Sequence, residues 1–202
     1  FDKVRGNIVI RYSKYGEEFV GLDGESYILK ADMIVICDDE GIISLAGIMG
    51  GKRTGCDLNT KNVLIESAYF LPERVAFAGR KLSIQSDARY RFERGIDPAS
   101  TIEGLNIATK LVVEKCGGEI GSIIHSGGYR GKDDKIKLKI SEVNKVLGLD
   151  FNSEYIESKL KGIGCKVMKK DNYFDIIPPT WRNDIAIKED LIEEVARLFG
   201  YE

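Results

Sequence analysis

The chain has 202 residues, which fits one large domain or two small ones, because domains usually run to about 100–150 residues. Hydrophobic residues make up 43% and charged residues 31%, which excludes a disordered, collagen-like or fibrous chain. Thirty basic against 32 acidic side chains give a formal net charge of −2, so the composition indicates no electrostatic footprint for nucleic acid. The single histidine, His125, excludes a zinc site with two histidines from this chain.

The four cysteines are widely spaced and form no Cys-x-x-Cys pair, so we expect reduced thiols rather than a disulfide framework. No apolar run approaches the roughly 18 residues that a membrane-spanning helix needs, and the chain shows no signal-peptide pattern. We therefore expect a cytoplasmic protein without a membrane partner. Because the chain starts at Phe1 rather than Met, we expect it to be a fragment of a longer polypeptide.

The first 70 residues carry mainly strand signals. Clustered Ile, Val, Leu and Tyr predict strands at residues 7–12, 26–29, 33–37, 42–46 and 63–69. The Asp-Asp-Glu-Gly turn at 38–41 predicts a hairpin between two of them.

The pattern turns helical after this region. Pro72 in a first-turn position predicts a helix start, Ser86 is expected to cap a second helix, and Asp97-Pro98 opens a longer one. Its apolar stripe runs from Ile102 to Cys116 before Gly117-Gly118 ends it.

Residues 126–134 are rich in glycine and charge, which predicts a linker and divides the chain into domains 1–128 and 129–202. The second block predicts three helices, the first capped by Ser141, together with a strand and a hairpin. The expected elements are the strand 135–140, the helices 141–147, 153–160 and 188–199, and the hairpin strands 166–168 and 173–177. This is the size of a winged-helix-like module. The expected fold class is therefore α+β, a layered sheet-and-helix module with a mostly antiparallel or mixed sheet, followed by that smaller one.

Two strings in the first block are candidate site elements. Gly47-Ile48-Met49-Gly50-Gly51 would let the backbone approach a ligand closely, although an ordinary glycine turn explains the string as well. Glu66 lies inside an otherwise apolar segment. If its side chain faces the core, the carboxylate needs hydrogen-bond donors there, which indicates a site. If the Glu66 side chain lies on the opposite face of the strand, it faces solvent and indicates no site.

A third string combines arginine with aromatic residues between Ser86 and Pro98. Arginine next to aromatic rings can contact phosphate and stack on bases. Alternatively, the arginines pair with neighbouring carboxylates and the aromatic side chains belong to the core. The residues in question are Arg89, Arg91 and Arg94 with Tyr90 and Phe92. The sequence leaves open whether this cluster contacts RNA or braces the fold.

A fourth string places carboxylates around the last predicted helix. Asp190, Glu193 and Glu194 are spaced i, i+3 and i+4, and Asp184 precedes them by six residues. Oxygen-only ligands suit a hard, partly hydrated cation such as magnesium. The alternative is that acidic residues favour a helix N-terminus through the helix dipole.

Taken together and in order, these strings resemble the beta subunits of bacterial phenylalanine–tRNA ligases over nearly the whole chain. Residues 22–24, 46–51, 66–70 and 91–98 (Arg-Phe-Glu-Arg-Gly-Ile-Asp-Pro) are similar to the editing module of that family. Residues 178–185 (Pro-Pro-Thr-Trp-Arg-Asn-Asp-Ile) and 189–197 are similar to the module that follows it.

For the first block, the resemblance implies hydrolysis of misacylated tyrosyl-tRNA(Phe). It places Glu66 as the acceptor of the phenolic proton, with the Gly47 and Gly50 backbone at the same pocket. Ser86, where the family commonly has threonine, and Ala88 would line that pocket. The family's editing histidine would lie upstream of Phe1, so we expect this chain alone to show weak or no deacylase activity and name no catalytic residue in it.

For the second block, the resemblance implies a magnesium site shared with the alpha subunit and formed by Asp184, Asp190, Glu193 and Glu194. It further implies an alpha2beta2 heterotetramer that binds tRNA(Phe) and ATP, with aminoacylation on the alpha subunit. Two other hypotheses remain: a non-catalytic RNA-binding scaffold arm, and a metal-dependent hydrolase that uses the acidic cluster. The second of these lacks a water-activating base nearby in sequence.

Overall fold

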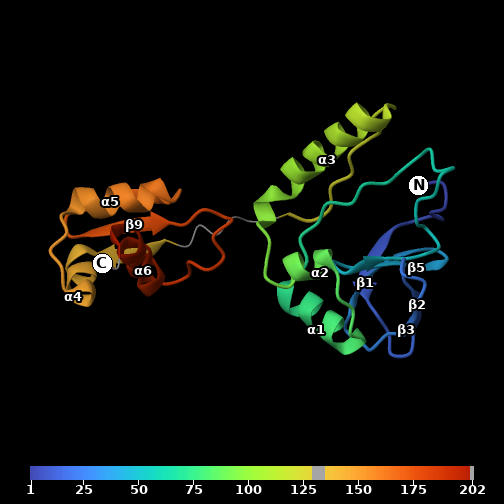
Figure 1. The fold of residues 1–202 in the computed structure, drawn as a ribbon, viewed down its shortest axis with the longest axis horizontal. Coiled ribbons are helices and arrows are strands. Elements are labelled where there is room, and N and C mark those ends of the chain that lie inside the picture. The colour runs from blue at the N-terminus through green and yellow to red at the C-terminus, as the bar shows by residue number, and fades with distance from the viewer. Residues whose placement is uncertain (129–134, 201–202) are drawn as a thin grey trace. The chain divides into compact units, whose positions relative to one another are not determined.

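The computed structural model describes residues 1–128 and 135–200. The chain forms two compact units, the first made of Phe1–Ile96 with Ser100–Ile123 and the second of Asp97–Ala99 with Ile124–Glu202. Most of the predicted linker at 126–134 lies outside the described residues. Both units combine helices with antiparallel sheets, so the fold class is α+β (Figure 1). In the described part of the chain no helix is long and apolar enough to cross a membrane.

The first unit contains a four-stranded antiparallel sheet and a two-stranded one. The larger sheet has the order β1-β4-β5-β6, and β2 pairs with β3 in the smaller. The strands are β1 (Val9–Tyr12), β2 (Glu18–Val20), β3 (Ser26–Ile28), β4 (Ile34–Asp38), β5 (Gly41–Leu45) and β6 (Met49–Gly50). Four predicted strands are thereby confirmed, whereas the short β2 and β6 were not predicted.

Asp38 fixes the turn between β4 and β5 and ties two distant segments to it. Its carboxylate accepts hydrogen bonds from the backbone N–H groups of Glu40 and Gly41 in the turn, and from that of Arg5. The Arg53 guanidinium lies 2.5 Å from the same carboxylate, whose side chain is fully buried. Burial alone would raise the pKa of Asp38, but these donors outweigh it and lower the pKa to about 2.

The depressed pKa of Asp38 predicts an acid-sensitive first unit. A carboxyl whose pKa is lower in the folded state stabilises the fold above its unfolded pKa, and this contribution is lost as pH falls through the folded pKa. We expect Asp38→Asn to lower the free energy of unfolding by about 2 kcal/mol near neutral pH and by much less at about pH 2. Urea unfolding of both proteins at the two pH values measures this, and a difference that does not shrink with acidification would contradict it.

Two helices that pack on each other complete the core of the first unit, and the first of them contacts β4 (Figure 1). They are α1 (Pro72–Leu82), with proline in its first turn as predicted, and α2 (Asp87–Phe92), capped by Ser86 as predicted. The fully buried side chains include Leu29, Met33, Val35 and Leu45 from the sheet side. A partly buried ion pair joins α2 to the residue that follows it, with Arg89 Nε 2.9 Å from Glu93 Oε2.

A 3₁₀ turn (Pro98–Ser100) leads into α3 (Thr101–Cys116), which ends at Gly117 as predicted. None of the α3 side chains is buried, so the predicted apolar stripe is not covered by the described residues. The strand predicted at 63–69 is wrong. This segment pairs with no strand in the described part of the chain, and its Val63 and Leu64 side chains are exposed. Apolar β-branched residues favour an extended chain, but a strand also requires a partner.

The second unit packs three helices on a three-stranded antiparallel sheet of order β7-β9-β8 (Figure 1). Its elements are β7 (Ile136–Lys139), α4 (Ile140–Leu147), α5 (Ser153–Gly162), β8 (Lys166–Lys169), β9 (Tyr173–Ile177) and α6 (Lys188–Phe199). Every predicted element of this block is present. The Ser141 cap is wrong, because α4 begins one residue earlier and the Glu142 carboxylate accepts from the Lys139 N–H instead.

Candidate functional site

A cavity of about 380 Å³ opens in the first unit between the β5–β6 turn, the extended segment 66–70, α2 and the start of α3. It brings together four of the five residues predicted for the pocket, namely Gly47, Gly50, Glu66 and Ala88. Gly47 and Ala88, the two most distant of these four residues, lie 41 positions apart in the chain. Phe92 adds an aromatic wall. An apolar cavity with few polar groups is typical of a small-molecule site.

Gly47 is required by both conformation and space. Its φ of +68° lies in the left-handed region, and a Cβ there would lie 3.1 Å from side-chain atoms of Phe70 and Val75. At Gly50, by contrast, a Cβ would meet only the end of the Leu22 side chain, at 3.2 Å. The glycine turn therefore serves the close packing of the cavity wall, at least at Gly47.

Ser86 does not line the cavity but holds two of its walls together. Its Oγ accepts a hydrogen bond from the Arg89 N–H at 3.0 Å, which caps α2, and donates one to the Ile48 carbonyl at 2.7 Å. The second bond fastens the glycine turn to the helix that carries Ala88. Ser86 is thus a positioning residue, and it acts through its hydroxyl.

This double role predicts that Ser86→Ala lowers the free energy of unfolding by about 1–2 kcal/mol, since the helix cap and one further hydrogen bond are lost. Ser86→Thr keeps the hydroxyl and is expected to remain within about 0.5 kcal/mol of the original. Chemical denaturation of the three proteins checks this. Equal stability of the alanine and threonine variants would show that the hydroxyl does not hold the turn.

Glu66 places a carboxylate at the cavity. Its side chain retains exposure to solvent, yet the protein around the carboxyl desolvates it enough to raise its pKa above the ordinary glutamate value. No group in the described residues hydrogen-bonds this carboxylate. A partly desolvated carboxylate without a donor is stabilised by any ligand that supplies one, such as a hydroxyl.

The arginine–aromatic string divides into a buried and an exposed part. Arg89 is buried and donates to Glu93 and to the Ile84 carbonyl, so it braces the fold. Arg94 is exposed, pairs with Glu93, and stacks its guanidinium 3.7 Å from the centre of the Tyr90 ring. The structural interpretation is therefore correct for Arg89, while Arg94 and Tyr90 remain accessible.

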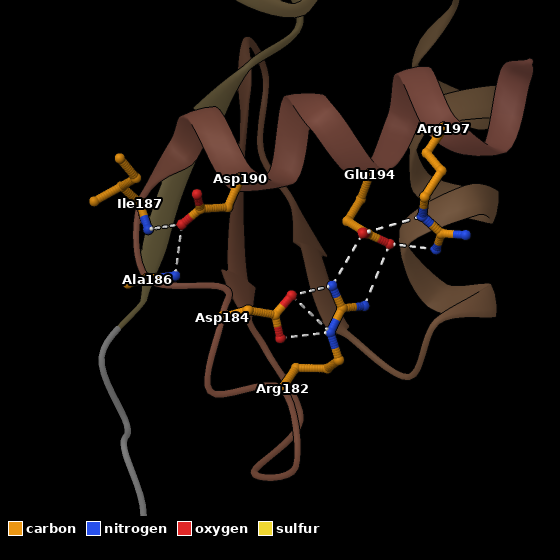
Figure 2. Close-up of polar contacts among 7 residues, drawn as sticks. All are labelled: Arg182, Asp184, Ala186, Ile187, Asp190, Glu194 and Arg197. Atoms are coloured by element: carbon orange, nitrogen blue, oxygen red, sulfur yellow. Dashed lines mark hydrogen bonds and ion pairs between the residues drawn. The ribbon is translucent and has the colours of Figure 1, made fainter. Parts of the chain in front are cut away.

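The acidic residues of the second unit bind arginines and backbone groups (Figure 2). Arg182 Nη2 lies 2.6 Å from Asp184 Oδ2 and 3.0 Å from Glu194 Oε1, and Arg197 Nη2 lies 2.6 Å from Glu194 Oε2. Asp190 Oδ2 accepts from the backbone N–H groups of Ala186 and Ile187 at 2.8 and 2.9 Å. The signal was visible in the sequence, because Arg182 precedes Asp184 by two residues and Arg197 follows Glu194 by three.

This donor set does not fit the magnesium ion that the resemblance implies. The described residues contain no group of three or more His, Cys, Asp or Glu side chains placed to hold a metal. The side chain of the remaining predicted ligand, Glu193, points to solvent. The Arg182 guanidinium holds the pKa of Asp184 below its usual range. Hydrogen bonds from Arg197 and Arg182 together lower the pKa of Glu194 to about 2.

Comparison with known proteins finds a family model for each of two parts of the chain. Residues 1–117 match the family model described as the B3/4 domain, and residues 136–201 match the tRNA synthetase B5 domain. The chain is 43% identical over 198 residues to the phenylalanine–tRNA ligase beta subunit of Rhodopseudomonas palustris, and 45% identical over 199 residues to that of Mesorhizobium japonicum. The chain belongs to the family of phenylalanine–tRNA ligase beta subunits.

Each match covers 98% of this chain but 25% of the relative, so the chain spans about a quarter of the length of these beta subunits. Among solved structures, an N-terminal fragment of the phenylalanyl-tRNA synthetase beta subunit from Pyrococcus horikoshii aligns with 17% identity and a TM-score of 0.46. That alignment covers 100% of this chain and 58% of the other.

Proposed function

We propose that the first unit is the amino-acid pocket of an editing site that hydrolyses tyrosyl-tRNA(Phe), within a beta subunit of phenylalanine–tRNA ligase. The observation that carries this proposal is the Glu66 carboxylate, which lies at the cavity, is partly desolvated and has no hydrogen-bond donor in the described residues. A tyrosyl phenol supplies the missing donor. A phenylalanyl ring of the same shape does not.

The energetics of discriminating tyrosine from phenylalanine support a separate editing pocket. A pocket built for phenylalanine rejects tyrosine only modestly, because excluding one added hydroxyl is worth on the order of a hundredfold. A second pocket whose carboxylate requires a donor discriminates in the opposite direction, since phenylalanine leaves that carboxylate unpaired. Tyrosine charged in error is then cleared, and correctly charged tRNA is spared.

The remaining parts of the proposal concern the whole enzyme. The chain's relatives are ligase subunits, and we propose that the full-length beta subunit assembles with the alpha subunit as an alpha2beta2 heterotetramer in the cytoplasm, with tRNA(Phe) and ATP as substrates. The second unit would dock on the alpha subunit, which would hold the aminoacylation site. The alternative is an RNA-contacting scaffold without catalysis, for which exposed Arg94 and Tyr90 supply side chains that RNA could contact.

The assembled enzyme, with full-length beta and alpha subunits, decides between the two. We expect it to release tyrosine from preformed tyrosyl-tRNA(Phe) much faster than it releases phenylalanine from phenylalanyl-tRNA(Phe). The scaffold alternative predicts that both esters decay at the uncatalysed rate. Equal and slow release of both amino acids would therefore overturn the editing proposal.

A further inference from the structure

The guanidinium of Arg182 lies between two carboxylates that come from different parts of the second unit. Its Nε and Nη2 face Asp184 at 2.8 and 2.6 Å, in a two-pronged contact, and its Nη1 and Nη2 face Glu194 on α6 at 3.3 and 3.0 Å. Figure 2 shows this guanidinium bracketed by the two acids. Paired, charge-assisted bonds of this kind are among the strongest polar contacts in proteins.

Two of the four carboxylates already have cationic partners. Arg182 pairs with both Asp184 and Glu194, and Arg197 pairs with Glu194, so neither of these two carboxylates lacks a positive charge beside it. Glu194 is buried, with 7% of its surface exposed, and its oxygens accept from both arginines. A magnesium ion would have to displace these donors and also lose part of its own hydration shell, which it does reluctantly.

The Asp190 carboxylate binds backbone N–H groups rather than an arginine. It accepts the Ala186 and Ile187 N–H groups and so closes the chain onto the first turn of α6 (Figure 2). Acidic side chains at a helix N-terminus are stabilised in this way by the free backbone donors. Three of the four acidic residues therefore serve the fold. Glu194 and Asp190 on α6 fasten the segment 182–187 to that helix, and Asp184 holds the Arg182 guanidinium from within the segment.

We propose that Arg182 and Arg197, in place of a divalent cation, neutralise Asp184 and Glu194 and thereby lock the segment before α6 onto that helix. The acidic cluster is a structural arginine–carboxylate network, and this beta chain holds no magnesium through it. The inference is independent of the editing function, because it concerns only the second unit.

Thermal unfolding of the 202-residue chain tests the network. Arg182→Met removes the guanidinium but keeps an apolar stem, and we expect it to lower the Tm of the second unit by about 10 °C or more, because Glu194 loses a buried partner. Lys188→Met is the matched control, since it breaks the partly exposed Lys188–Glu142 pair of the same unit. That change is expected to cost less than about 4 °C. An unchanged Tm for Arg182→Met would overturn the proposal.

Magnesium itself provides a second readout that holds even if Arg182→Met does not fold. We expect the Tm of the unaltered chain to be the same in excess EDTA and in millimolar MgCl₂, with no saturable heat of magnesium binding. In the assembled full-length enzyme, Asp184→Asn is expected to leave the number of bound magnesium ions per alpha–beta pair unchanged. Stabilisation of the chain by magnesium, or loss of one ion per pair in the variant, would overturn the proposal.

Discussion

Glu66→Ala in the assembled enzyme is expected to slow hydrolysis of tyrosyl-tRNA(Phe) by about 10- to 100-fold, because a hydrogen bond to a charged group contributes about 1.5–3 kcal/mol. Glu66 lies at a cavity of about 380 Å³ with no other partner in the described residues, so its removal leaves the fold intact. Charging of tRNA(Phe) with phenylalanine is expected to stay at the level of the unaltered enzyme.

Glu73→Ala is the matched control for this measurement. Glu73 is an exposed glutamate in the first turn of α1, seven residues from Glu66 and outside the cavity lining. We expect it to leave tyrosine release within about twofold, since surface substitutions usually change energies by less than about 0.5 kcal/mol. Similar rates for both variants would mean that the Glu66 carboxylate does not bind the tyrosyl group.

Gly79→Ala is expected to destabilise the first unit by about 1–3 kcal/mol, although alanine is normally the better helix residue. A Cβ at Gly79 in α1 would lie 2.2 Å from Nε of Arg89. Arg89 cannot move aside at little cost, because it is buried and bound to Glu93 and to the Ile84 carbonyl. The two helices approach each other through this glycine.

Gly104→Ala is the same substitution in a helix without the crowding. A Cβ at Gly104 would meet only the Ser67 hydroxyl, at an ordinary 3.6 Å. We expect this variant to be more stable than the unaltered chain by about 0.5–1 kcal/mol, through helix propensity alone. Chemical denaturation of the pair checks both signs. A stabilised Gly79→Ala would contradict the packing described for α1 and α2.

Local signals in the sequence located most elements of the fold. The last helix was predicted with both its ends, because its acidic first turn and Gly200 mark them and its apolar face is regular. The β4–β5 hairpin was predicted from its turn residues. These features depend on neighbours in the chain, which a sequence displays directly.

Features that depend on distant partners were harder to predict. The segment 63–69 has strand composition, yet in the described part of the chain it finds no strand to pair with. Ser86 was expected in the pocket, but its hydroxyl is taken up by the Ile48 carbonyl. The acidic cluster has the spacing of a metal site, and although Arg182 and Arg197 lie near it in sequence, only the structure shows which carboxylates they bind. Residue type and spacing therefore identified the candidates, but not their partners.

The interaction at the centre of this account is the bond between a tyrosyl phenol and the Glu66 carboxylate. Its most direct test is the affinity of non-hydrolysable tyrosyl and phenylalanyl analogues of the tRNA 3′ end for the assembled enzyme, with and without Glu66→Ala. We predict a coupling of about 1.5–3 kcal/mol between the phenolic hydroxyl and Glu66, so that only the tyrosyl analogue loses affinity in the variant. Equal losses for both analogues, or none, would contradict the account.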